Sequence, residues 1–387
     1  MKPPIELLAP AGDFNRAQTA FYFGADAVYL GGKDFGLRAH AVNFTNREMQ
    51  KLVTLAHANG KKVYVTVNIF ARNQDFTKLV TYAKQLDALH VDAVIVSDLG
   101  VMKVFREHTS LPIHVSTQAN ICNKYTARQY VELGASRVIL ARELNIKEIK
   151  EICAYLKGKA EVEVFVHGAM CVSYSGRCLL SNYFANRPAN RGDCTHPCRY
   201  AYALHEERRP GEFFPVEEDQ HGTYIMNSRD LCLIDHLSEL IAAGVTSLKI
   251  EGRMKSEYYV AGVVNAYRQA LDGKKLDYTQ ELAKVAHRPY TTGFTFDNVP
   301  TEYPSHATAV QTYEFVALVK NPRAVIIKNK ICPGDVIEIL SPTDTNGKTF
   351  VWQAGLANVP ESVVTLTDCP YPLHPNDILR KPVRASH

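Results

Sequence analysis

The chain has 387 residues, of which 46% are hydrophobic and 22% charged, and its formal net charge at pH 7 is +4. This is the composition of an ordinary globular protein, long enough for two or three domains or for one large barrel with an appendage. The weak positive charge does not by itself indicate a polyanionic partner, so a case for nucleic acid must rest on local patches.

The N-terminal stretch, MKPPIELLAPAG, lacks the features of a signal peptide. No apolar run approaches the roughly 18 residues that a membrane span needs. We therefore expect a cytoplasmic protein without a membrane partner. In that setting its nine cysteines indicate metal binding or thiols rather than a disulfide framework.

Strand-like and helix-like segments alternate from residue 5 to about 272. The strand-like runs are IELLAP, AVYLGG, KVYVTVNIF, AVIVSD, PIHVSTQ, RVILAR, VEVFVH and SLKIEG, with amphipathic helical patterns between them. Eight such units over about 250 residues predict a parallel (β/α)8 TIM-type barrel over residues 1–275. A doubly wound open sheet is the alternative, but no GxGxxG follows the first strand.

One segment interrupts this rhythm, at about residues 168–232. It is rich in Asn, Arg, Pro, Gly and Cys and ends near a strand-like YIMN, which favours a functional insertion on the catalytic face. A connector follows the barrel at residues 276–305. Residues 306–387 then alternate apolar and polar positions, with turn signals at NPR, PGD, PTDTNG and HPND, so we predict a small all-β barrel or sandwich.

In such a barrel the active site lies at the carboxyl ends of the strands. The residues at those ends are Pro10, Gly12, Gly31, Gly32, Asn68, Asp98, Gln118, Asn120, Arg142, Glu143, His167, Glu251 and Arg253. Each alone is more often a strand-end cap or a salt bridge, but together they suit a small anionic ligand. Arg142 and Arg253 can hold carboxylates by paired hydrogen bonds, and we assign Gln118 and Asn68 to the same substrate-binding set.

Hydrolase signatures are weak in this sequence. There is no GxSxG, and HEERR lacks the second histidine of HExxH. A cysteine peptidase stays open as an alternative, because His167 and His196 lie near Cys171 and Cys194 in sequence. His167 and Glu251 are our candidates for handling protons in any reaction.

The cysteines give a sharper signal. Cys171, Cys178, Cys194 and Cys198 fall within 28 residues, and Cys232 follows at the end of the insertion. Two thiolates ~4 Å apart repel by roughly 1 to 4 kcal/mol at effective dielectric constants of about 80 to 20, and a metal removes that cost. Paired CxxC knuckles typical of structural zinc are absent, whereas iron–sulfur clusters accept wider spacing. The spacing favours a cluster and leaves zinc or redox-active thiols open.

Residues 171–200 are locally basic and aromatic. They include Arg177, Arg187, Arg191 and Arg199 against the single acid Asp193, interleaved with Tyr174, Tyr183, Phe184 and Tyr200. These side chains could contact phosphates and stack on bases. Equally, the arginines could screen a negatively charged cluster that the aromatic rings cover.

Several long motifs resemble a known family. EVFVHGAMCVSYSGRCLLS is similar to the signature of the collagenase-like peptidase family thirty-two, and LLAPAG, RGDCTHPCR, MNSRDLCLIDHL, SLKIEGRMKSEYYVAGVVNAYR and RPYTTGF extend the resemblance over the whole chain. Despite its label, the family includes proteins that hydroxylate RNA, one of which makes 5-hydroxyuridine at the wobble position of tRNA and depends on prephenate. It also includes an oxygen-independent pair in ubiquinone hydroxylation that carries 4Fe-4S clusters.

The resemblance implies a tRNA uridine hydroxylase with a 4Fe-4S cluster and a prephenate-like dicarboxylate as co-substrate. It also leaves open a partner subunit from the same family. Carried onto this sequence, the cluster ligands are Cys171, Cys178, Cys194 and Cys232. Spacing alone would make Cys198 the fourth ligand, so it is the alternative. A collagenase-like peptidase and a non-catalytic cluster-bearing partner are the competing functions.

Overall fold

The computed structural model describes residues 5–36, 43–170, 229–296 and 310–383, together with parts of the insertion. These parts are residues 178, 180–185, 187 and 193–195 and the two-residue strands β8 (Leu204–His205), β9 (Phe213–Phe214), β10 (Glu218–Asp219) and β11 (Gly222–Thr223). The predicted YIMN strand lies outside the described residues.

The chain divides into two compact units. The first comprises Met1–Phe14, Asp26–Met254 and Arg288–Thr308, and the second comprises Asn15–Ala25, Lys255–His287 and Ala309–His387. Segments far apart in sequence therefore pack into one unit. The domain boundaries expected at residues 275 and 305 stay predictions.

Eight parallel strands of the first unit close into a barrel, as predicted. They are β1 (Glu6–Pro10), β2 (Ala27–Gly31), β3 (Lys62–Val67), β4 (Ala93–Val96), β5 (Ile113–Val115), β6 (Arg137–Ile139), β7 (Glu161–Ala169) and β13 (Ser247–Ile250). Each pairs with the next in chain order, and β13 pairs with both β7 and β1 to close the ring. Residues in these strands are nearly all buried, which explains their continuous apolar runs.

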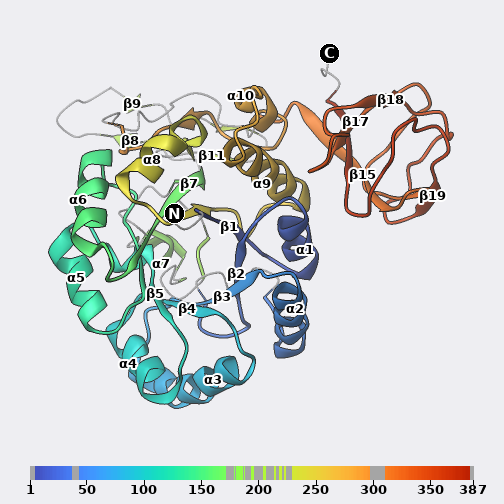
Figure 1. Ribbon diagram of the computed structural model, residues 1–387. Helices are drawn as coiled ribbons and strands as arrows, with labels where there is room; N and C mark the ends of the chain where they lie inside the picture. The colour runs from blue at the N-terminus through green and yellow to red at the C-terminus, as the bar shows by residue number, and fades with distance from the viewer. Residues whose placement is uncertain are drawn as a thin grey trace. The chain divides into compact units, whose positions relative to one another are not determined.

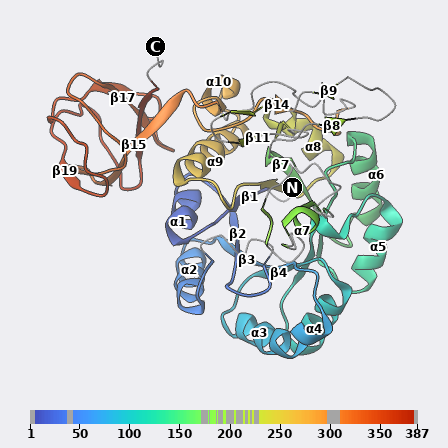
Figure 2. The same ribbon diagram turned by 180° about the vertical axis from the view of Figure 1, so that it is seen from behind.

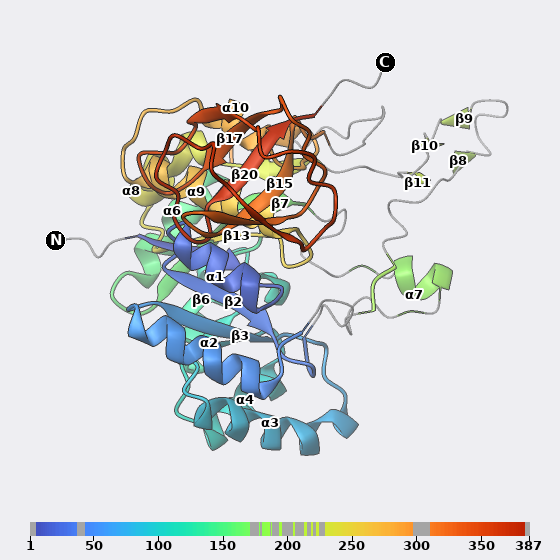
Figure 3. The same cartoon turned by 90° about the vertical axis from the view of Figure 1, so that its right-hand side faces the viewer.

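Helices follow the strands in the predicted alternation. In the first unit they are α2 (Asn46–Ala58), α3 (Phe76–Ala88), α4 (Leu99–His108), α5 (Lys124–Glu132), α6 (Ile146–Leu156), α7 (Leu180–Ala185) and α8 (Leu237–Ala243), with short 3₁₀ turns at Asn73–Asp75, Thr117–Ala119 and Ile234–His236. Helices α2 to α6 surround the strands in two opposite views (Figures 1 and 2), and α2 runs along the outside of β2 and β3 in Figure 3.

Local sequence signals set where these helices begin and end. Thr45 and Glu48 form a reciprocal capping box at the start of α2, and Asn123 caps α5. Helix α8 ends at Gly244, whose φ of 103° is left-handed and therefore suits glycine.

Two short strands, one at the end of the insertion and one after the last barrel strand, extend the barrel sheet. Strand β12 (Asp230–Cys232) pairs antiparallel with the far end of β7, and β14 (Tyr290–Thr291) pairs with β12. An ion pair between Arg288 Nη2 and Asp230 Oδ1, 2.7 Å apart, links the two segments. The insertion therefore ends at the carboxyl edge of the barrel.

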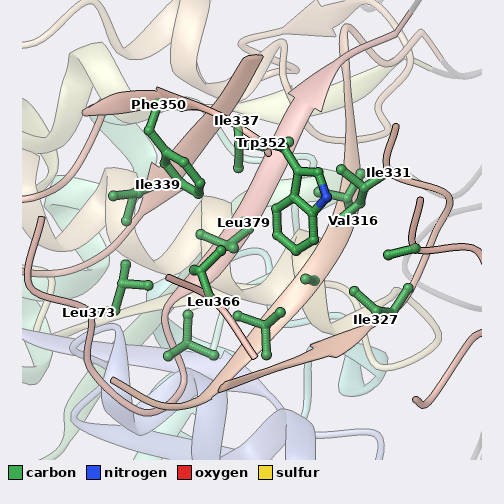
Figure 4. Close-up of a cluster of buried hydrophobic side chains, with 14 residues drawn as sticks. Val316, Ile327, Ile331, Ile337, Ile339, Phe350, Trp352, Leu366, Leu373 and Leu379 are labelled. Atoms are coloured by element: carbon green, nitrogen blue, oxygen red, sulfur yellow. The ribbon is translucent and has the colours of Figure 1, made fainter. Parts of the chain in front are cut away.

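Among its described residues, the second unit contains an antiparallel sheet and three helices. Its helices are α1 (Phe14–Tyr22), α9 (Glu257–Leu271) and α10 (Tyr278–Leu282), and its strands are β15 (Tyr313–Asn321), β16 (Ala324–Ile327), β17 (Val336–Leu340), β18 (Thr349–Val351), β19 (Val363–Thr365) and β20 (Ile378–Pro382). The order β18-β17-β20-β15-β16-β19 forms a half-barrel, and Figure 4 shows the side chains around Trp352 that fill it. The predicted all-β module is confirmed.

Buried ion pairs join this sheet to the helices of the same unit. Arg380 is fully buried and its guanidinium bonds Glu338 and Glu281, while Lys284 Nζ lies 2.7 Å from Glu338 Oε1. Tyr22 of α1 donates to Asp377 Oδ1 at 2.8 Å. Across the described residues, no helix combines the length and apolar character that crossing a membrane requires.

Candidate active site at the barrel mouth

Arg253, after β13, is held over the ends of β2 and β3. Its Nη1 donates to Thr66 Oγ1 at 2.9 Å and its Nη2 to Asn43 Oδ1 at 3.0 Å. The guanidinium passes so close to Gly31 that a Cβ there would lie 2.6 Å from Nη2. Gly31 therefore leaves the space through which Arg253 reaches across the mouth.

The two amides assigned to substrate binding contact each other. Asn68 Nδ2, after β3, donates to Gln118 Oε1 at 2.6 Å, and Ser116 Oγ donates to the same oxygen at 3.3 Å. Ser97 Oγ donates to the carbonyl of Asn68 at 3.1 Å. A belt of amides and hydroxyls thus lines the carboxyl ends of β3, β4 and β5.

Arg142 occupies a different part of the rim. Its Nη1 donates to the carbonyl of Ala169, at the end of β7, at 2.8 Å, and its guanidinium carbon lies 5.4 Å from the centre of the Phe165 ring. Strands β4 and β5 separate its side of the ring from the strands over which Arg253 lies. The two arginines therefore approach the mouth from different sides and do not form one clamp.

His167 and Glu251, the candidates for proton handling, come together on neighbouring strands. The backbone N–H of Glu251 donates to the carbonyl of His167 at 2.8 Å. Tyr29 OH donates to Glu251 Oε2 at 3.2 Å and to the carbonyl of Ile250 at 3.0 Å, which orients the carboxylate. Tyr29 was not among the residues predicted for the site. Both faces of β2 are buried, so the sequence gives no sign that Tyr29 packs with Leu8 and Tyr64 in the barrel interior.

A buried ionic network fills the barrel interior beneath the residues at the strand ends. Arg137 Nη1 lies 2.6 Å from Glu6 Oε1 and 2.9 Å from Glu163 Oε2, and Lys249 Nζ lies 2.8 Å from Glu163 Oε1. His114 is also buried there, and its pKa lies well below the usual value because of burial and the positive charges of Arg137 and Lys249. His114 is therefore neutral at physiological pH, and the barrel interior is a packed ionic floor.

Cys232 lies at the rim, opposite His167 in the antiparallel pair of β12 and β7. Tyr290 of β14 lies nearby: its ring centre is 5.4 Å from that of His167. Burial, with the negative charges of Cys232 and Asp230, raises the pKa of Tyr290. A thiol, an imidazole and a neutral phenol therefore share this edge of the mouth.

Two more candidate ligands are tied together through Ser181, which lies on α7 just after Cys178. Ser181 Oγ accepts from the backbone N–H of Thr195 at 3.0 Å and donates to the carbonyl of Asp193 at 3.2 Å. These bonds reach the residues immediately before and after Cys194, so the chain segments that carry Cys178 and Cys194 lie close to each other. Asp193 also pairs with Arg187, one of the four arginines of this stretch.

These donors suit an iron–sulfur cluster in their chemistry. Cys178, Cys194 and Cys232 are partly buried thiols outside any disulfide, as a thiolate-ligated cluster requires. Within the described residues, however, no three His, Cys, Asp or Glu side chains are close enough together to hold a metal ion. Cys171 and Cys198 lie outside those residues, and so does His196.

The match to a family model described as Peptidase family U32 extends over residues 12–303, most of the chain. The chain belongs to peptidase family U32. Among relatives in this family, "tRNA hydroxylation protein P" of Escherichia coli is 38% identical, over 87% of this chain and 86% of its own length. An "Uncharacterized protease" of Methanocaldococcus jannaschii is 44% identical over 76% of this chain and 74% of its own. The "23S rRNA 5-hydroxycytidine C2501 synthase" of Escherichia coli is 37% identical over 69% of this chain and 39% of its own.

Proposed function

We propose that this U32 protein hydroxylates RNA, and specifically that it converts the wobble uridine of tRNA to 5-hydroxyuridine. The observation that carries the proposal is the likeness to a tRNA hydroxylation protein at 38% identity over 87% of the chain. A second relative is named for the synthesis of 5-hydroxycytidine in ribosomal RNA, so two relatives with RNA-modification names each match more than two thirds of this chain. The co-substrate would be a prephenate-like dicarboxylate.

The mouth offers groups for both reactants. The amides and hydroxyls over β3 to β5 can hydrogen-bond a neutral base, and arginines lie on two sides of the rim. Glu251 and His167 can hold or accept a proton at the mouth, because each borders the ring that the strand ends form. Tyr29 fixes the Glu251 carboxylate in place.

We assign a 4Fe-4S cluster to Cys171, Cys178, Cys194 and Cys232, with Cys198 as the alternative fourth ligand. The support is the spacing of the thiols, the family resemblance and the Ser181 link between the segments of Cys178 and Cys194. A bound cluster would supply one-electron redox chemistry or hold the insertion in place. Zinc is the other metal that such thiols could bind.

The experiment is complementation. The gene is expressed in a strain that lacks its own tRNA hydroxylation protein and the parallel oxygen-dependent pathway, and tRNA nucleosides are measured by mass spectrometry. We expect 5-hydroxyuridine derivatives to return, and to return only when prephenate synthesis is intact. Unchanged nucleosides despite soluble expression would contradict the proposal.

A second function has one observation in its favour. Cys232 and His167 face each other across antiparallel strands, a placement in which a thiol and an imidazole can form a nucleophile–base pair. A peptidase of this kind would cleave gelatin as metal-free protein and lose that activity on Cys232→Ser. Inactivity of the clean, folded protein would remove this alternative, as would cleavage that persists in Cys232→Ser.

A further inference from the structure

Asn120 is an energetic anomaly at the barrel mouth. It follows the 3₁₀ turn after β5, and its backbone is left-handed, with φ 54° and ψ 48°. Both polar atoms of its side-chain amide are shielded from solvent, and among the described residues neither has a hydrogen-bond partner. Shielded polar groups without partners cost stability, so native chains rarely keep them without a reason.

Arg142 adds a third unmet group, on a neighbouring segment of the mouth. The backbone N–H of Ala141 donates to the carbonyl of Ile121 at 3.1 Å, so the residues that follow β5 and β6 lie next to each other. Nη1 of Arg142 is engaged by Ala169, whereas its Nε is shielded and, in the described part of the chain, has no partner. By contrast, Asn68 Nδ2 and Gln118 Oε1 bond each other in the same ring.

We propose that Asn120 and Arg142 bind the hydrogen-bonding edge of a pyrimidine base, an inference that rests on the proposed RNA substrate. Asn120 Nδ2 and Arg142 Nε are two donor groups, and Asn120 Oδ1 is an acceptor. The edge of uracil or cytosine presents two acceptors and one donor, so one such edge carries a partner for each of the three groups. A carboxylate has acceptors only and would leave Asn120 Oδ1 unmet, while the guanine edge has two donors and one acceptor.

The left-handed backbone supplies a competing explanation. Asn tolerates this conformation better than most residues, so Asn120 could be present for its backbone alone. Asn120→Gly separates the two, because glycine adopts the same backbone without strain and removes the amide. The matched control is Asn123→Gly, three residues later, where Asn123 Oδ1 accepts from Thr126 N at 2.8 Å and caps α5.

The test measures RNA binding by the full-length protein. Dissociation constants are determined for an anticodon stem-loop with a wobble uridine and for the same stem-loop with an abasic site at that position. We expect the wild-type protein to prefer the intact stem-loop by about tenfold, which two or three hydrogen bonds can supply. Asn120→Gly should bind both RNAs equally, with a melting temperature equal to or above that of the wild type. Asn123→Gly should keep the preference.

Any other outcome contradicts either this inference or the proposed function. If Asn120→Gly keeps the wild-type preference, or loses it together with a lower melting temperature, Asn120 has a backbone or structural role and the inference is overturned. If the wild type binds both RNAs equally tightly, the base is not contacted and the inference fails while the proposed function stands. If the wild type binds neither RNA, the proposed function itself fails.

Discussion

Lys249 and Glu163 form an ion pair inside the barrel, with Nζ 2.8 Å from Oε1 and both side chains at most 4% exposed. The same Nζ lies 4.4 Å from the centre of the Tyr29 ring, and Tyr29 in turn donates to Glu251 at the mouth. The buried floor and the candidate proton-handling carboxylate are therefore connected through one aromatic side chain.

Removing the carboxylate at the centre of this floor should be strongly destabilising. Glu163→Gln leaves Lys249 and Arg137 buried with one fewer counter-charge, which costs about 3 kcal/mol in the free energy of unfolding. Urea unfolding followed by far-ultraviolet circular dichroism measures the loss. Glu161→Gln is the control, because Glu161 also pairs with Arg137 but is 52% exposed and should cost less than about 1 kcal/mol. Equal losses in the two variants would show that the floor is not a buried network.

The second unit should lose stability in acid through Glu338. Burial alone would raise its pKa, but the charges and hydrogen bonds of Arg380 and Lys284 outweigh burial and lower the pKa. A carboxyl whose pKa is lower in the folded state contributes stability above its unfolded pKa, near 4.5, and loses it as the pH falls through the folded value.

Glu338→Gln tests this pH dependence. We expect the difference in unfolding free energy between wild type and variant to be largest near pH 7 and to shrink below about pH 4.5. Trp352 is the single tryptophan of the chain and is buried in the core of this sheet, so its fluorescence reports this unit selectively. Glu361→Gln, at an exposed pair with Lys328, should differ little from wild type at any pH. A difference for Glu338→Gln that stays constant with pH would contradict the assignment.

Placement of Arg253 should depend on Gly31. In Gly31→Ala the new Cβ would lie 2.6 Å from Nη2, and the guanidinium must move away from Thr66 and Asn43. Because the clash falls on the end of a flexible side chain, we expect a small change in melting temperature and a loss of RNA hydroxylation of about tenfold. Gly36→Ala is the matched control, because the atom nearest to a Cβ at Gly36 would be Thr66 Oγ1, at an ordinary contact distance of 3.7 Å. Full activity of Gly31→Ala would show that the position of Arg253 does not matter.

Metal content should follow the cysteines of the insertion. Protein purified without oxygen is expected to carry about four iron and four sulfide per chain. Cys178→Ser and Cys232→Ser should lower both, whereas Cys332→Ser, in the other compact unit, should not. Stoichiometric zinc without sulfide would show that the site binds zinc and not an iron–sulfur cluster. Protein that contains no metal would exclude both assignments.

The barrel could be predicted because its strands are buried on both faces, which leaves continuous apolar runs such as AVIV in β4. The antiparallel module could be predicted because turn residues separate its short strands. Placement of His167 and Glu251 on one edge followed from the rule that parallel strands bring their carboxyl ends together.

The alternation of strands and helices and the set of residues at the strand ends can be read from the amino-acid order, because they depend on local propensity and burial. Which members of that set contact each other depends on how the barrel closes. Asn68 and Gln118 are 50 residues apart and Arg253 and Thr66 are 187 apart, yet each pair is joined by a hydrogen bond. A hydrogen bond forms only when its donor and acceptor lie about 2.7 to 3.2 Å apart, and only closure of the ring brings these side chains to that distance.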